Sequence, residues 1–275
     1  MQLTILCDNR VATRAGLMGE HGFSCHIAVA GKQYLFDTGN GLGLVNNAEI
    51  CGIDLKEVDA VLLSHGHWDH CSGLLPLLQL RKGKPTPIYA HPDIFTQKIS
   101  RSKGEERFIG TGFTQEEAEA VGARFYFSAA PVELFGGLLF SGEIPREIET
   151  DHDQALFYRQ AEALITDPLR DDQSLYLQSE SGLIVLCGCA HAGVRNILAH
   201  AIKLCGGGKI HALIGGLHLS FKSREQRSQI IEDLRRYELQ LLAASHCTGQ
   251  TALSELINCF GPAVTPGDVS CCFQF

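Results

Sequence analysis

Short hydrophobic runs, several of them alternating with polar positions, recur through the first half of the chain and predict β-strands. Two of them, residues 24–31 and 32–39, are expected to form a hairpin. A helix is expected at residues 114–122, where Thr114 takes the N-cap position and Glu117 completes a capping box. Further strands are predicted at residues 2–8, 60–63, 87–93, 124–130, 131–137 and 138–144, and a further helix at 71–80.

The second half of the chain alternates hydrophobic runs with amphipathic ones, a pattern typical of strand–helix units. Helices are expected at residues 192–208, 223–239 and 251–261, a hairpin at 174–193, and strands at 209–220 and 240–249. The polar stretch 146–171 fits neither pattern. Strands followed by strand–helix alternation indicate an α/β fold in which helices cover sheet layers from the outside. We expect one domain over residues 1–275, with residues 93–145 as a candidate inserted α+β subdomain.

The acidic composition of the chain disfavours some classes of binding partner. The chain has 275 residues, of which 31 are acidic and 23 basic, and a formal net charge of −8. Because nucleic acid binding needs a basic face, this charge argues against it. No apolar run reaches the ~18 residues of a membrane span, and the first residues lack the basic and apolar regions of a signal peptide. We therefore expect a cytoplasmic protein that acts on a small molecule and binds no membrane.

The highest density of possible metal ligands directly follows the apolar strand 60–63. The next seven residues read Ser-His-Gly-His-Trp-Asp-His. In an extended or turn conformation, His65 and His67 point to the same side and can chelate one metal ion, while Asp69 and His70 can reach a second. Imidazole and carboxylate ligands suit zinc, and also iron or manganese. The alternative is a chance cluster of surface histidines, which is disfavoured because the chain has only 12 histidines and these lie directly at a strand end.

This H-x-H-x-D-H motif and its preceding strand resemble the metallo-β-lactamase superfamily. Leu35–Gly39 (LFDTG) is similar to that superfamily's first motif, whose aspartate, here Asp37, supports the metal ligands through hydrogen bonds. The combination of SHGHWDH, GCAHAG, GGLHL and SHCTG looks like a subgroup named after 7,8-dihydropterin-6-ylmethyl-4-(β-D-ribofuranosyl)aminobenzene-5′-phosphate synthase. The resemblance implies a four-layer αββα sandwich and a dinuclear metal site. Aspartic proteases also carry a D-T-G, but they need two such carboxylates and would leave the histidine cluster unexplained.

Late strand ends carry the other ligand candidates that the resemblance implies. His246, in SHCTG, matches the fifth motif of the superfamily, which completes the shell of the second metal. The fourth motif usually supplies an aspartate; here Cys189 stands in its place and His191 follows two residues later. Either can bind metal, and we favour His191. His218 ends the neighbouring strand and is expected beside His246, as a ligand or as a contact for the substrate.

The third motif of the superfamily, a histidine before the strand at residue 174, is missing from its usual context. The shell of the first metal is therefore incomplete, and His191 or His218 is expected to substitute. Other candidates in or near that region are His152, Asp171 and Asp172, in no matching context, and Glu143, by position. The histidines interpreted as structural or surface residues are His21, His26, His91, His200 and His211, of which His26 and His211 lie inside strands.

These assignments predict a metal-dependent hydrolase that acts on an ester, lactone or phosphoester of a small molecule, with a pterin- or phosphate-containing substrate as one option. Two divalent ions, with zinc favoured, would hold a hydroxide that attacks a carbonyl or phosphoryl centre. Asp69 would orient the hydroxide, and His218 would polarise the substrate or protonate the leaving group. Two alternatives stay open: a di-iron redox protein, which usually needs a flavin-binding partner domain, and a non-catalytic metal-binding protein of the same fold.

Overall fold

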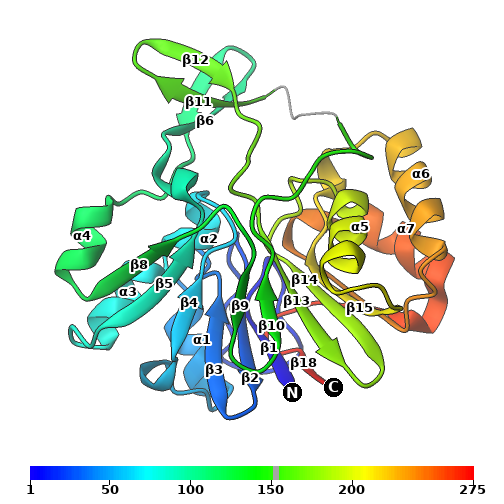
Figure 1. The fold of residues 1–275 in the computed structure, drawn as a ribbon, viewed down its shortest axis with the longest axis horizontal. Helices are drawn as coiled ribbons and strands as arrows, with labels where there is room; N and C mark the ends of the chain where they lie inside the picture. The colour runs from blue at the N-terminus through cyan, green and yellow to red at the C-terminus, as the bar shows by residue number, and fades with distance from the viewer. Residues whose placement is uncertain (151–154) are drawn as a thin grey trace.

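Two seven-stranded sheets packed face to face form the centre of the molecule, a computed structural model that describes residues 1–150 and 155–275 (Figure 1). The first sheet has the order β18 (Cys272–Gln274), β1 (Gln2–Cys7), β2 (Ser24–Val29), β3 (Lys32–Phe36), β4 (Ala60–Leu62), β5 (Thr86–Ala90) and β8 (Ala123–Phe127). The second has the order β17 (Val264–Pro266), β16 (Leu241–Ser245), β15 (Ile210–Gly216), β14 (Gly182–Cys187), β13 (Ser174–Ser179), β10 (Leu138–Phe140) and β9 (Val132–Leu134).

Helices cover the outer face of each sheet, as Figure 1 shows. The helices on the first sheet are α1 (Leu44–Ile50), α3 (Leu74–Leu80) and α4 (Gln115–Ala120), and those on the second are α5 (Val194–Leu204), α6 (Arg224–Arg235) and α7 (Gln250–Phe260). Shorter helical turns are α2 (Trp68–Cys71), η1 (Leu55–Glu57), η2 (Pro92–Phe95), η3 (Leu219–Phe221), η4 (His246–Thr248) and η5 (Gly261–Ala263).

Three hydrophobic clusters fill the spaces between the four layers. One lies between the two sheets, and the other two lie between each sheet and its helices. The pattern of side chains explains this: α5 buries Val194, Ile197, Leu198 and Ala201, which recur on one face of a helix, and every residue of β4 is buried. The αββα sandwich expected from the sequence is confirmed, and so is the capping box of α4 between Thr114 and Glu117.

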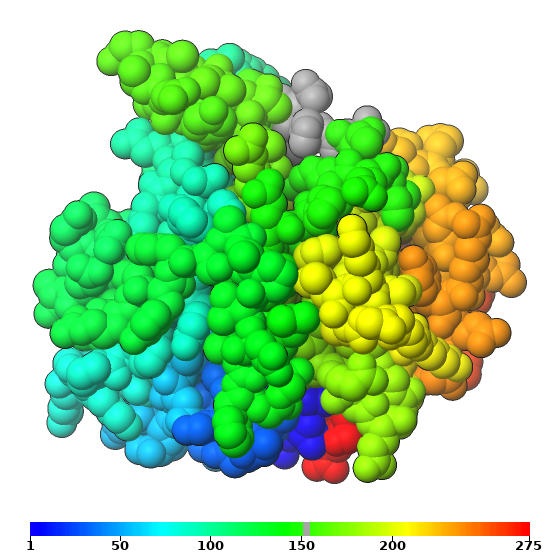
Figure 2. Space-filling model, in the orientation of Figure 1, coloured from blue at the N-terminus to red at the C-terminus, as the bar shows by residue number. Residues whose placement is uncertain are grey.

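A third, smaller sheet stands over one rim of the sandwich and projects beyond its body (Figures 1 and 2). Its order is β12 (Ala163–Thr166), β11 (Leu156–Gln160), β6 (Lys98–Ser102) and β7 (Glu105–Phe108). The expected subdomain over residues 93–145 does not coincide with this sheet. Strands β8, β9 and β10 return to the two large sheets, while β11 and β12 come from the stretch that the sequence left unassigned.

The chemistry-bearing segments lie at one rim because parallel strands end there together. Strand β14 pairs with β15 in parallel, and β15 with β16, so that Gly216 lies opposite Ser245. The segments that follow these strands, with Cys189, His218 and His246, are therefore neighbours. Among the described residues, no helix has the length and apolar character needed to cross a membrane.

Candidate metal centre

The histidine motif turns sharply where β4 ends. His67 keeps an extended backbone and caps α2, which carries Asp69 and His70 on a single short turn. Gly66 is required by space, because a Cβ there would collide with the carbonyl oxygen of Ile94. The Gly66 N–H donates to the Asp171 carboxylate at 2.8 Å, and this hydrogen bond holds the loop in place. This tight path brings the motif's side chains into one buried cluster.

His65, His67 and His191 form the first half of that cluster. His65 Nε2 lies 3.0 Å from His67 Nδ1, and the His191 ring centroid lies 4.8 Å from that of His65 and 4.9 Å from that of His67. His191 Nε2 is buried without a hydrogen-bond partner among the described residues. His191 thus occupies the region where the missing third motif was expected to contribute.

Asp69, His70 and His246 form the second half. His246 Nε2 lies 3.3 Å from Asp69 Oδ2 and 3.3 Å from His70 Nε2. The halves adjoin, since the ring centroids of His65 and His70 are 4.2 Å apart. The structure therefore brings together all six residues predicted as metal ligands, three in each half.

The hydrogen bonds around His70 and His246 indicate which ring nitrogens are free to bind a cation. His70 Nδ1 donates to the buried Asp37 carboxylate at 2.7 Å, so its Nε2 presents a lone pair when the ring is neutral. His246 Nδ1 lies 2.8 Å from Asn9 Oδ1, and the orientation of that amide is set by the Gly22 N–H, which donates to the same oxygen. With both rings neutral, two lone pairs would face each other at 3.3 Å, so this contact needs either a proton on His70 or a bound cation.

Cys189 lies between the two halves. Its thiol belongs to one group with His65 and His191 and to another with His70 and His246, and the ligand atoms of each group lie within 4.8 Å of one another. Its Sγ is also 3.2 Å from Cys247 Sγ and 3.5 Å from His218 Nδ1. The sequence left Cys189 and His191 as alternative ligands, with His191 favoured; both side chains lie in the cluster.

Burial keeps most of these imidazoles neutral. Desolvation lowers the pKa of His67 and of His218 to about 3 and that of His246 to about 4. His70 differs: burial opposes its charge, but the adjoining Asp37 carboxylate raises its pKa to about 9. Burial also opposes the charge of Asp69, yet the hydrogen bond from His21 and the adjoining rings of His246 and His70 lower its pKa well below the usual range. Neutral imidazoles beside a carboxylate and a thiol are a donor set that suits a divalent metal.

The other candidates for the incomplete shell lie elsewhere. Glu143 is half exposed and faces Arg170, and it does not line the pocket. Asp171 is buried beneath the motif, where it accepts from Gly66 and from Lys98 at 2.8 Å. Asp172 accepts from the Ala192 N–H and thereby supports the turn that carries His191. His152 lies outside the described residues. Both aspartates accept hydrogen bonds from backbone N–H groups next to the ligand candidates, and this explains why neither carboxylate reaches the candidate metal centre.

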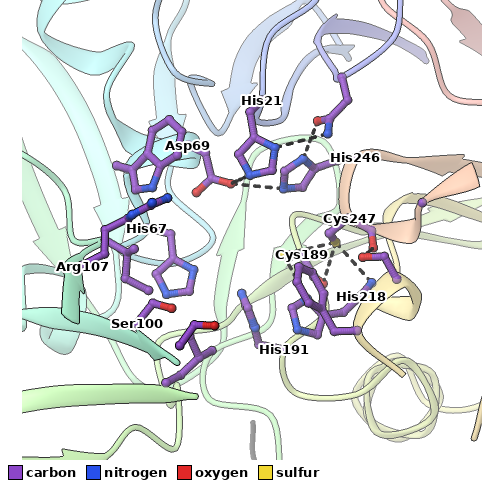
Figure 3. Close-up of a pocket in the computed structure, with 18 of the residues that line it drawn as sticks. His21, His67, Asp69, Ser100, Arg107, Cys189, His191, His218, His246 and Cys247 are labelled. Atoms are coloured by element: carbon purple, nitrogen blue, oxygen red, sulfur yellow. Dashed lines mark hydrogen bonds and ion pairs between the residues drawn. The ribbon is translucent and has the colours of Figure 1, made fainter. Parts of the chain in front are cut away.

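His21 and Asn9 belong to the site although sequence reasoning did not include them. His21, interpreted as structural or surface, places Nε2 3.2 Å from Asp69 Oδ2, as Figure 3 shows. Asn9 Nδ2 lies 3.2 Å from His21 Nδ1, which makes that nitrogen the acceptor and leaves Nε2–H to donate to the carboxylate. Asn9 could have been found, because it follows the end of β1 at the same rim; His21 carries no such signal. His26 and His211 lie in β2 and β15, as expected.

The cluster opens into a cavity of about 700 Å³. Figure 3 shows Asp69, His67, His191, His218 and Cys189 around its base. The small third sheet and the loop after β15 supply its walls. His218 adopts a left-handed backbone conformation, with φ 53°, and its Nε2 is buried without a hydrogen-bond partner among the described residues. The site is thus a deep, open pocket with metal-type ligands at the bottom.

Comparisons with known proteins agree with this fold. The 7,8-dihydropterin-6-methyl-4-(beta-D-ribofuranosyl)-aminobenzene-5'-phosphate synthase of Methanocaldococcus jannaschii is 29% identical over 261 residues, which cover 90% of this chain and 88% of that protein. The crystal structure of Tm1679, a metal-dependent hydrolase of the β-lactamase superfamily, matches with a TM-score of 0.85 and 25% identity, and the match covers 100% of this chain and 99% of that one. YhfI from Bacillus subtilis, a metallo-β-lactamase fold protein, has a TM-score of 0.58 at 14% identity, covering 100% and 98%, which is a likeness of fold alone.

The subgroup resemblance inferred from the strand-end motifs is confirmed by the synthase of M. jannaschii. The family profile described as the metallo-beta-lactamase superfamily matches residues 24–224, which include the histidine motif, Cys189, His191 and His218. Fold, motif order and this match agree, and the chain belongs to the metallo-β-lactamase superfamily.

Proposed function

We propose that this protein is a metal-dependent hydrolase that holds two divalent ions. His65, His67 and His191 would hold the first, and Asp69, His70 and His246 the second. The observation that carries the proposal is the convergence of these six side chains, within which the His70 and His246 Nε2 atoms lie 3.3 Å apart beside the Asp69 carboxylate. In the metal-free protein at neutral pH a proton on His70 Nε2 holds this contact, and a divalent cation bound by the two imidazoles and Asp69 would take its place.

Zinc is the ion that this donor set fits best, with iron or manganese as alternatives. When bound, two such ions would supply Lewis acidity and a nucleophile that is active near neutral pH. Cys189 adjoins both sets of ligands, and a thiolate ligand there would favour zinc further. We rank Cys189 below His191 as a ligand, because its Sγ also contacts Cys247 and His218.

The chain's own residues would position the reacting groups. His21 donates to Asp69 through its Nε2–H, and this helps to keep the carboxylate ionised and fixed in orientation. His218 lines the pocket with a free Nε2, so it can hydrogen bond to the substrate. Because its pKa is about 3, the ring is neutral at pH 7, which favours polarisation of the substrate over proton donation to a leaving group.

The substrate we propose is a small molecule with an ester, lactone or phosphoester bond. A second candidate function is a synthase reaction on a pterin- or phosphate-containing substrate, which is favoured by the 29% identity to the M. jannaschii synthase over 90% of this chain. The products separate the two: a hydrolase incorporates oxygen from labelled water, whereas a synthase joins two organic substrates.

Elemental analysis of the purified protein tests the metal assignment. We expect close to two ions per chain in the wild type, and the loss of at least one when both His65 and His67 are replaced by Ala. His211→Ala is the matched control, because His211 lies in β15 against Phe275, outside the pocket. Full metal content in the double variant would refute the assignment. Screening phosphodiesters, lactones and thioesters then tests hydrolysis, and no turnover of any class by the fully metallated protein would argue for a non-catalytic role.

A further inference from the structure

One wall of the pocket is a two-stranded ribbon of the small sheet. Strands β6 and β7 pair so that Ser100 lies opposite Arg107 and Ser102 opposite Glu105. All four residues line the pocket. Since alternate residues of a strand face opposite sides, they form one face of the ribbon, while Arg101 and Glu106 lie on the opposite, outer face, although Glu106 also borders the pocket.

The charged side chains on the two faces of the ribbon differ in whether they are paired. Glu106 receives hydrogen bonds from Arg101 at 2.6 Å and from Arg159 at 2.9 Å, so the outer face is internally paired. Arg107 makes no ion pair and no side-chain hydrogen bond with any residue that the structure describes. A guanidinium with five donors is therefore presented to the pocket without a partner.

Arg107 also lies near the metal-type ligands. The end of β7 is attached to the histidine motif, because the Trp68 N–H donates to the carbonyl oxygen of Ile109 at 3.1 Å. Arg107 precedes Ile109 by two residues, and Figure 3 shows its side chain on the His67 side of the pocket. Glu105, which makes no ion pair with a residue in the described part of the chain, lies two residues before Arg107 on the same face.

The loop after β15 provides a flat apolar surface elsewhere in the pocket. Phe221 is 65% exposed, and its ring stacks on His218 with centroids 4.5 Å apart and an interplanar angle of 25°. An aromatic side chain held in place but left exposed at a pocket is suited to pack against a planar part of a ligand.

We propose that Arg107 and the Ser100 hydroxyl bind an anionic group of the substrate, a phosphate or a carboxylate, whose planar part packs on Phe221. A guanidinium can bind either oxyanion through two parallel hydrogen bonds, and a hydroxyl on the facing strand adds a third donor. This inference deepens the proposed function and rests on it for the identity of the pocket as the active site. Arg107 is then a residue that selects anionic substrates, and its loss raises KM more than it lowers kcat.

Trp68 supplies a direct measurement of binding. It is the only tryptophan in the chain and lines the same pocket, so its fluorescence reports on ligands there. The purified, metal-containing protein is titrated with phenylphosphonate, benzoate and benzyl alcohol. Wild type is compared with Arg107→Gln and with Arg101→Gln, the matched control on the outer face of the same ribbon.

For Arg107→Gln we expect the Kd of the preferred anion to rise at least tenfold, which equals about 1.4 kcal/mol. The Kd of benzyl alcohol should change less than twofold, and Arg101→Gln should resemble wild type for all three ligands. Arg107→Lys keeps the charge but not the paired donors, and an intermediate Kd is expected. Whether phenylphosphonate or benzoate shows the larger loss identifies the phosphate or the carboxylate as the anion.

Unchanged binding of both anions in Arg107→Gln, or an equal loss in Arg101→Gln, overturns the proposal. Metal content of each variant is measured in parallel and should match wild type, since Arg107 is exposed and contacts no proposed ligand. Repeating the titration on metal-depleted protein tests the anion site separately from the proposed metal-dependent function. An effect of Arg107 that persists there supports the anion site, even if the metal analysis were to refute the proposed hydrolase.

Discussion

Replacing Asp37 by Asn should weaken metal binding without rebuilding the site. Asp37 is fully buried and accepts three hydrogen bonds of 2.7 Å, from the Ser64 N–H, the Ser64 hydroxyl and His70 Nδ1. Asn has the same shape and tolerates the positive φ of 57° found at this position. Its amide, however, has only one acceptor atom for these three donors.

The substitution changes the tautomer of His70. The Oδ1 position of the new amide can still accept from the Ser64 N–H, so its NH₂ group points at His70 Nδ1. His70 must then accept there, which moves its own proton to Nε2 and directs it at the metal position. Loss of such a supporting carboxylate lowers metal affinity by about 10- to 100-fold, which is about 1.4 to 2.7 kcal/mol.

Competition with a calibrated zinc chelator measures the affinity, and urea unfolding of the metal-free protein measures any loss of stability. Asp59→Asn is the control: Asp59 also accepts from a backbone N–H, of Gln33, and from Lys32, but it lies outside the pocket. We expect Asp37→Asn to lose affinity at one of the two positions and Asp59→Asn to lose none. Equal zinc affinity in Asp37→Asn and wild type would show that Asp37 does not set the tautomer of His70.

Three further predictions concern the proposed ligands. His191→Ala should abolish tight binding at one metal position while Cys189→Ser costs little; a thiolate charge-transfer band in the cobalt protein that disappears in Cys189→Ser would reverse this ranking. His246→Ala should lose metal and activity but remain folded, and a thermal melt beside metal analysis would expose a purely structural role as lost stability with retained metal. Because Asp37 raises the pKa of His70 to about 9, the metal-free protein carries a proton there at neutral pH that metal must displace. Zinc affinity should therefore rise about tenfold per pH unit toward pH 9 and then level off, and a flat profile in chelator competition between pH 7 and 9 would contradict this.

The sequence predicted those parts of the site that local patterns encode. His65, His67, Asp69 and His70 follow a buried strand within a few residues, so their common location follows from the turn itself. His246 could be predicted for the same reason, since it directly follows a buried strand in an otherwise regular strand–helix alternation.

Contacts between distant segments could not be predicted in this way. The hydrogen bond of His21 to Asp69 depends on how the loop before β2 folds back over α2, for which the sequence carries no periodic signal. Strands β7 and β12 consist mainly of exposed residues, so the hydrophobic alternation that identifies strands is absent from them. That is why the small sheet was not recognised, and with it the wall that carries Arg107.

Each half of the cluster combines ligand candidates that follow strands of both sheets. Asp69 and His70 follow a strand of the first sheet, whereas His191 and His246 follow strands of the second. Ions held between them would act as a cross-link between the two sheets, and the free energy of binding would be added to the free energy that holds the sheets together. At a free metal concentration 100 times the Kd, this amounts to about 2.7 kcal/mol per site. Depletion of the metal would then weaken the attachment of the two sheets as well as the activity of the pocket, leaving the hydrophobic interface and hydrogen bonds such as that from the His246 N–H to Asp8 to hold them.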